Sequence, residues 1–165
     1  MGSYADDALF MSRNNIEYVE LISDDGKSKV MVIPAWQGRV MTTSAAGDEG
    51  DSYGWINYSF IKKRQIDLQF NPVGGEERFW LGPEGGVFSL YFRQGEKQIY
   101  KNWKVPPVLD IEAFKIQSQS KNCICLTKEG CLTNACGTTF YLNIKRTISL
   151  LAVSYTHLRA HETDQ

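Results

Sequence analysis

The sequence has no large excess of charge of either sign and no long apolar segment. Its 165 residues include 18 lysines and arginines against 19 aspartates and glutamates, so the net charge is −1. A nucleic-acid-binding surface concentrates positive charge, and a membrane-spanning helix needs about 18 or more consecutive apolar residues. The sequence therefore predicts no nucleic-acid partner and no membrane partner. The N-terminus shows no basic region followed by an apolar core, so no signal peptide is visible, and both a cytoplasmic location and export from an upstream start stay open.

Histidine is almost missing from the chain. Both histidines, His157 and His161, lie in the final stretch VSYTHLRAHETDQ. Their i, i+4 spacing would place both imidazoles on one face of a helix, as a metal pair requires. The β-branched and aromatic run from Val153 to Thr156 disfavours a helix, however. Histidine chemistry therefore depends on whether this stretch is native.

The C-terminal stretch resembles a translated sequencing adapter. Residues 152–163 fit one reading frame of the transposase adapter that is used in short-read libraries. Such scars are excluded from fold reasoning. The resemblance predicts that residues 1–152 belong to one domain, that residues 153–165 are a non-native tail, and that the natural chain continues beyond Leu151. Without the tail the net charge becomes 0 and no histidine remains.

Paired metal-binding cysteines and a phosphate loop are also missing. The four cysteines follow the pattern C-x-C-x5-C-x4-C from Cys123 to Cys136, which lacks the C-x2-C pairs of a zinc ribbon. Cys123 and Cys125 would share one face of a strand, where metal binding and a disulfide are the alternatives to plain packing. Gly74-Gly75 and Gly85-Gly86 do not open a helix in the pattern of a phosphate loop. The sequence predicts no metal and no cofactor.

Alternating apolar and polar residues dominate the rest of the chain. One helix is expected at residues 3–12, with Ser3 as its N-cap. Strands are expected at 16–22, 29–33, 38–44, 87–93, 108–118, 122–127 and 138–151, with turns at 24–26, 121–122, 129–130 and 137. Because no β-α-β alternation occurs, the strands are expected to pair antiparallel in two facing sheets. The predicted fold class is an all-β antiparallel β-sandwich with a short N-terminal helix.

Residues 46–86 are rich in glycine and aromatic side chains, and such irregular segments in a strand-rich domain are typical of a functional face. A sugar pocket needs aromatic surfaces for the ring faces and planar donors and acceptors for the hydroxyls. The residues that meet this need are Arg39, Asn57, Arg78, Trp80 and Glu84, with Trp55 beside Asn57. We predict that the first five bind substrate. Ordinary loop packing, with the tryptophan in the core and the arginines solvated or paired, is the alternative.

Two segments, PAWQGRVMTTSAAGDEGDSYGWINYSFI and NPVGGEERFWLGPEGGVFSLYF, resemble a group of uncharacterised bacterial domains with a galactose-mutarotase-like fold. The segment GTTFYLNIKRTISLL is similar to a further strand of that group, and the resemblance covers residues 6–151. It implies a β-supersandwich of two large twisted sheets, of which this chain is the N-terminal half, with a sugar cleft on one concave face. The wider superfamily includes aldose epimerases, sugar-phosphate mutarotases, lyase domains and domains without known activity.

The resemblance implies a carbohydrate-related protein of the aldose-epimerase type, with a sugar or oligosaccharide as its ligand. Mutarotation needs a general base and a general acid, which are Glu and His in well-studied epimerases. Residues 1–152 contain no histidine, so the catalytic residues stay unknown and are expected beyond the cut. The alternatives are a non-catalytic carbohydrate-binding module that uses the same residues, and a structural sandwich in which Trp80 is core and Glu84 pairs with an arginine.

Overall fold

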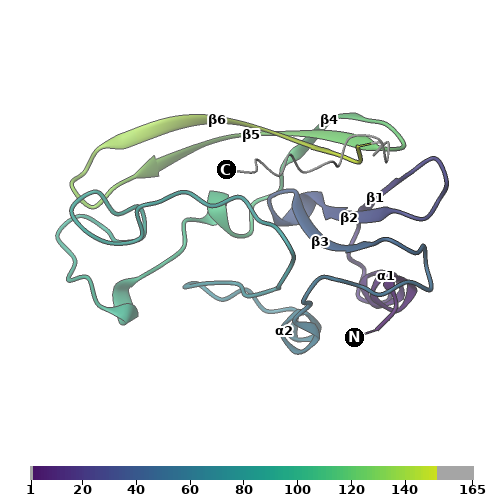
Figure 1. Cartoon of the computed structure of the whole chain (residues 1–165). Helices are drawn as coiled ribbons and strands as arrows, with labels where there is room; N and C mark the ends of the chain where they lie inside the picture. The colour runs from purple at the N-terminus through teal and green to yellow at the C-terminus, as the bar shows by residue number, and fades with distance from the viewer. Residues whose placement is uncertain (1, 152–165) are drawn as a thin grey trace, which may run out of the picture.

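A computed structural model describes residues 2–151 and has a mostly-β architecture (Figure 1). The elements in chain order are α1 (Tyr4–Arg13), β1 (Val19–Ile22), β2 (Lys29–Ile33), η1 (Pro34–Trp36), β3 (Arg39–Ser44), α2 (Tyr58–Lys63), η2 (Tyr100–Asn102), η3 (Pro107–Leu109), β4 (Lys115–Gln119), β5 (Cys123–Thr133) and β6 (Thr139–Ser149). The strands form two three-stranded antiparallel sheets, β1-β2-β3 and β4-β5-β6. The mostly-β class, the antiparallel pairing and the short N-terminal helix are confirmed. The predicted tail, residues 153–165, lies outside the described residues.

The first sheet begins with a hairpin between β1 and β2, in which Val19 pairs with Val32. The turn contains Gly26 at a φ of 73°, which glycine adopts without strain, so the turn predicted at 24–26 is confirmed. Strand β2 then pairs with β3, with a register shift after Met31. Four of the five residues in β2 are buried, because both faces of this central strand are covered.

The second sheet is built on a long hairpin between β5 and β6, each of 11 residues. Its turn contains Gly137 at a φ of 90°, at the predicted position. The turn predicted at 129–130 is wrong, because Glu129 pairs with Asn143 and Gly130 with Leu142 within the continuous ladder. A Cβ on Gly130 would lie 3.0 Å from the Val108 side chain, so this glycine lets another segment approach the strand closely.

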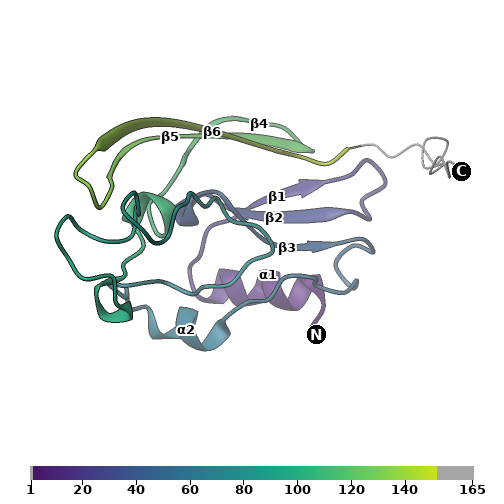
Figure 2. The ribbon, with the colours of Figure 1, turned by 60° about the vertical axis from the view of Figure 1, so that its left-hand side comes forward.

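Two apolar clusters cover the two faces of the first sheet. The cluster between the sheets includes Val30, Val32, Ile124 and Leu126. The cluster between the first sheet and the helices includes Met31, Ile33, Tyr4 and Met11. The two views agree on the resulting order of layers, with the β4-β5-β6 sheet above the β1-β2-β3 sheet and both helices on the far side (Figures 1 and 2). Alternating side chains of β2 therefore contribute to both clusters.

The strand predicted at residues 87–93 is wrong. The backbone there bonds to scattered partners: Leu90 N donates to Pro83 O, and Tyr91 O accepts from Lys104 N. A strand requires consecutive pairing with one neighbour, which this segment does not have. The strand predicted at 108–118 is shortened for a related reason. Residues 107–109 form η3, which begins at the second of two consecutive prolines that lack an N–H, and the ladder starts only at Lys115.

Helix α1 is held by a cap at its N-terminus and by a buried carboxylate on its inner face. Ser3 and Asp6 form a capping box, which confirms the predicted N-cap. The Asp7 carboxylate is 2% exposed and accepts hydrogen bonds from the Ser52 hydroxyl and the Tyr58 phenol. Asp7 thereby joins α1 to α2, which sequence analysis did not identify because YSFIKK is only six residues long and contains few strong helix formers.

The free energy of unfolding is expected to fall as the pH rises from 10 to 12, and Tyr58 should account for a measurable part of that fall. Partial burial and then the hydrogen bond to Asp7 raise the pKa of Tyr58 from its ordinary 10 to about 12. In this window the folded state keeps the phenolic proton that the unfolded state loses, so this contribution is complete below pH 10 and disappears by pH 12. Urea unfolding across this range should show a shallower pH slope for Tyr58→Phe than for the parent. The exposed Tyr53→Phe is the matched control, and equal slopes for all three proteins would contradict the assignment.

Candidate functional site

Three of the five predicted substrate-binding residues lie in contact with one another. The guanidinium carbon of Arg78 lies 4.1 Å from the centre of the Trp80 ring. The Trp80 Nε1–H donates to Glu84 Oε1 at 2.9 Å. Trp80 also packs half-buried against the cluster between the sheets. The loop at 78–84 thus brings a cation, an aromatic ring and a carboxylate together, as a stacked and hydrogen-bonded unit.

Arg39 is 1% exposed, and its charge interacts with that of Arg78. Its Nη1 donates to Gly74 O at 2.8 Å, whereas Nε and Nη2 have no hydrogen-bond partner among the described residues. Burial, followed by the nearby charge of Arg78, lowers the pKa of Arg39 to about 10. A Cβ on Gly75 would lie 2.8 Å from Arg39 Cδ, so the Gly74-Gly75 pair provides space for this side chain.

Asn57 caps helix α2, and its side chain makes no hydrogen bond with the other four in the described part of the chain. Its Oδ1 accepts from Phe60 N at 3.2 Å, and its Nδ2 donates to Pro72 O at 2.9 Å. Both ends of the amide are therefore bonded to backbone. Trp55, two residues earlier, is 64% exposed. The charges of Arg39 and Arg78 therefore interact, whereas the Asn57 side chain bonds to nearby backbone.

Asp110 is a central residue of this region that sequence analysis missed. It is 3% exposed and accepts from Asn71 N at 2.9 Å, from Asn71 Nδ2 at 2.8 Å and from Arg78 at 3.4 Å. Burial lowers the pKa of Arg78, and the Asp110 carboxylate opposes that shift. The only signal in the sequence is one aspartate in VLDIE, which resembles the polar position of an alternating strand.

Behind Trp80, three further aromatic rings form a continuous stack. Ring centroids are 5.1 Å apart for Trp80 and Tyr91, 5.7 Å for Tyr91 and Trp103, and 6.3 Å for Trp103 and Tyr100. Tyr91 is 1% exposed at the middle of the stack, and its hydroxyl donates to Leu81 O at 2.7 Å. Tyr100 at the outer end is 78% exposed. The stack therefore connects Arg78 in the interior with the surface near η2.

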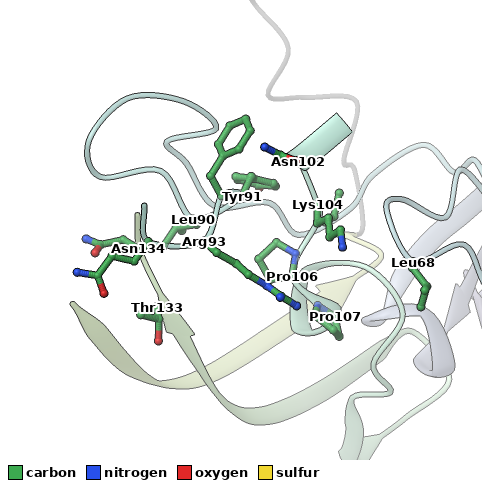
Figure 3. Close-up of a pocket in the computed structure, with 13 residues that line it drawn as sticks. Leu68, Leu90, Tyr91, Arg93, Asn102, Lys104, Pro106, Pro107, Thr133 and Asn134 are labelled. Atoms are coloured by element: carbon green, nitrogen blue, oxygen red, sulfur yellow. The ribbon is translucent and has the colours of Figure 1, made fainter. Parts of the chain in front are cut away.

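A cavity of about 440 Å³ lies next to this stack (Figure 3). It is lined by residues 90–94, 102, 104–107, 133–134 and Leu68. Backbone hydrogen bonds hold these segments together: Lys104 N donates to Tyr91 O at 2.9 Å, and Ala135 N donates to Ser89 O at 2.8 Å. The cavity is thus formed where the irregular 87–107 segment meets the end of the β5–β6 hairpin.

The lining of the cavity combines apolar walls with hydrogen-bond donors. Leucine and proline side chains form the walls, and the polar groups are Arg93, Gln94, Asn102, Lys104, Thr133 and Asn134. None of the five predicted substrate-binding residues lines this cavity, and the described lining residues include no carboxylate and no imidazole. Sequence analysis missed the cavity because it assigned residues 87–93 to a strand and because the three segments are far apart in the chain.

Comparison with family models matches residues 2–160 to a family described as a family of unknown function (DUF6786). No curated protein and no solved structure matches the chain. The matched range extends past residue 152, after which the non-native tail was predicted to begin.

Proposed function

Since the chain belongs to the DUF6786 family, whose function is unknown, we propose from its own geometry that it binds a carbohydrate in the cavity between the 87–107 segment and the β5–β6 hairpin. The observation that carries the proposal is the cavity itself. Its volume of about 440 Å³ lies within the range of roughly 300–1,000 Å³ that is usual for small-molecule sites. Its mixed lining suits a ligand with both C–H faces and many hydroxyls.

The walls and the donors have separate roles in this proposal. Leu68, Pro106 and Pro107 offer apolar surface to the C–H faces of a sugar ring, while Asn102 and Gln94 offer amides to its hydroxyls. An amide both donates and accepts hydrogen bonds. Asn102 Nδ2 already donates to Lys97 O at 2.9 Å, so its Oδ1 and its second N–H are the groups that we assign to the ligand. Figure 3 shows Asn102 at the short helix η2, and Pro106 close to Arg93 and Pro107.

The predicted residues Arg78, Trp80 and Glu84 support the cavity rather than line it. Trp80 packs against Tyr91, and Tyr91 is a residue of the cavity wall. Arg78 lies on Trp80, and the Glu84 carboxylate accepts its indole N–H, so both hold the orientation of the ring. Arg39 and Asn57 make their contacts elsewhere, with Gly74 O and at the cap of α2.

Binding is favoured over epimerisation by the chemistry of the lining. Mutarotation requires a general acid and a general base within hydrogen-bond reach of the sugar. Among the described residues, the cavity wall contains neither a carboxylate nor a histidine, and the hydroxyl of Tyr91 is bonded to Leu81 O. Aldose-epimerase activity therefore stays a prediction of the sequence resemblance alone, and the non-catalytic module is the function that we propose.

We further infer that the two sheets are the layers of a β-sandwich, of the galactose-mutarotase-like type that the sequence resembles. Support comes from the apolar cluster to which both sheets contribute, with Val32 on one side and Ile124 and Leu126 on the other. Facing sheets that share one apolar core are the arrangement of a sandwich.

The proposal is tested by filling the cavity. Leu68 is 85% exposed and lines the cavity, so Leu68→Trp should fold normally and occupy the site. Saturation-transfer NMR and calorimetry with a panel of mono- and disaccharides should detect binding to the parent and at least tenfold weaker binding to Leu68→Trp. The matched control is Ile66→Trp, since Ile66 is also exposed in this segment but lines a different cavity. Failure of the whole panel to bind the parent, or equal binding by Leu68→Trp, would overturn the proposal.

A further inference from the structure

Two cationic side chains line the cavity without an ion-pair partner in the described part of the chain. Arg93 and Lys104 are both exposed and belong to the cavity wall. Some basic residues elsewhere do form ion pairs, such as Lys29 with Glu20 and Asp48, and Lys128 with Glu112 at 2.7 Å. The cavity thus has two positive charges that the described protein does not neutralise by contact.

Two carboxylates that are close in sequence to residues of the cavity wall bond to backbone amides and not to the two cations. Glu96 accepts from the backbone N–H of Arg93 at 3.4 Å rather than from its guanidinium. Asp67, beside the wall residue Leu68, accepts from Gln69 N at 2.7 Å and from Phe70 N at 3.3 Å. Neither Glu96 nor Asp67 lines the cavity. The wall itself therefore carries a formal charge of +2 with no opposing acidic side chain.

The two cationic side chains come from chain segments that are bonded to each other at the cavity. Figure 3 shows the Arg93 side chain extending past Pro106 toward Pro107, with the Lys104 ammonium also beside Pro106. Backbone pairing of Lys104 N with Tyr91 O brings the two chain segments together at this point. A guanidinium offers a planar pair of N–H donors that matches a carboxylate or a phosphate, and an ammonium adds a point charge. Positive groups in a concave site also raise the local concentration of anions.

We propose that the ligand of this cavity is an acidic saccharide, whose carboxylate or phosphate group lies between Arg93 and Lys104 while its ring hydroxyls bond to Gln94 and Asn102. This inference rests on the proposed carbohydrate-binding function and specifies its ligand class. A neutral sugar would occupy the same walls but would leave both cations without a partner. A preference for acidic over neutral sugars is therefore expected here, whereas carbohydrate binding in general would not require it.

The test compares each acidic sugar with its neutral counterpart by calorimetry. Glucuronate, galacturonate and mannuronate are paired with glucose, galactose and mannose, and the three hexose 6-phosphates form a second arm that separates a carboxylate ligand from a phosphate ligand. At least one acidic member should bind ten times or more tightly than its neutral partner. That preference should shrink as sodium chloride is raised from 20 to 300 mM, because salt screens the attraction.

Variants assign the preference to the two cations. Arg93→Gln and Lys104→Gln should each weaken binding of the acidic sugar about tenfold more than they weaken binding of its neutral counterpart. Lys101→Gln is the matched control, because Lys101 is an exposed lysine of the same segment that does not line the cavity.

Each alternative outcome has a distinct meaning. Equal binding of acidic and neutral sugars would overturn this inference while leaving the carbohydrate function intact. Binding of acetate or inorganic phosphate as tightly as the acidic sugar would identify an anion site and overturn the saccharide assignment. No binding by any member of the pairs would overturn both.

Discussion

Replacing Gln37 with leucine is expected to lower the free energy of unfolding by about 3 kcal/mol. Gln37 has no exposed surface, and its side chain satisfies two backbone groups in the interior. Its Nε2 donates to Leu109 O, and its Oε1 accepts from Phe79 N at 2.6 Å. Leucine has a similar size but neither polar atom. Phe79 N would lose its partner, and a buried group left without one costs about 1–3 kcal/mol. Leu109 O would lose one of two bonds, because it also accepts from Arg78 Nη2 at 2.6 Å.

The effect should be large because Gln37 connects separate parts of the chain. Its backbone N–H donates to Glu112 O at 3.1 Å, and its carbonyl accepts from Arg146 Nη1 at 3.2 Å. The turn between η1 and β3 is thereby bonded to the loop at 79, to the segment after η3 and to strand β6. Loss of the side-chain bonds should loosen the contact between the two sheets.

Chemical denaturation measures this effect. Gln37→Leu should unfold at a lower denaturant midpoint than the parent, with the same m-value. The matched control is Gln119→Leu, the same substitution at an exposed position of β4, which is expected to change stability by less than about 0.5 kcal/mol. Leucine and glutamine are both unbranched at Cβ, so the positive φ of 57° at position 37 should add little to the difference. Similar midpoints for the two variants would contradict the assigned role of Gln37.

Replacing Gly74 with alanine is expected to destabilise the protein by roughly 3 kcal/mol or more. Gly74 has a φ of 96°, which side-chain-bearing residues rarely adopt. A Cβ there would also overlap Trp55 O and lie 3.1 Å from Trp55 C and 3.2 Å from Asn57 N. Backbone atoms cannot move aside without breaking the bridge between Ile56 and Gly74. Both strain and displacement therefore act at the same residue.

Gly26→Ala is the control that separates these two causes. Gly26 also has a positive φ, 73°, but nothing lies within 4 Å of a Cβ added to it. Its replacement should therefore cost only the backbone strain of roughly 1–2 kcal/mol. Thermal melts of both variants measure the difference, and equal losses would show that the close approach to Trp55 has no energetic role.

The Gly74 prediction also bears on the meaning of the GGEERFW segment. Its unusual composition led sequence analysis to a substrate-binding interpretation. The structure provides a packing reason for part of it: Gly74 O accepts from buried Arg39, Gly75 leaves room for that side chain, and Glu77 pairs with Arg146 of β6. An unusual segment can therefore reflect tight packing as well as a ligand.

Several features were determined by the sequence itself, because they depend on neighbours along the chain. The capping box of α1, the β1–β2 hairpin with Gly26 and the β5–β6 hairpin with Gly137 follow from local alternation and from turn residues that accept a positive φ. Arg78, Trp80 and Glu84 lie together for the same reason, since they belong to one short loop.

Only the tertiary structure decided the features that join distant segments. The partners of Gln37 lie 42, 72 and 109 residues away, and the bond from Asn71 to Asp110 spans 39 residues. The cavity with Arg93 and Lys104 is formed by segments that share no periodic pattern, because backbone bonds between irregular loops leave no periodicity in the sequence. Local hydrogen-bonding and turn preferences thus determined the elements of this protein, whereas long-range packing determined its candidate site.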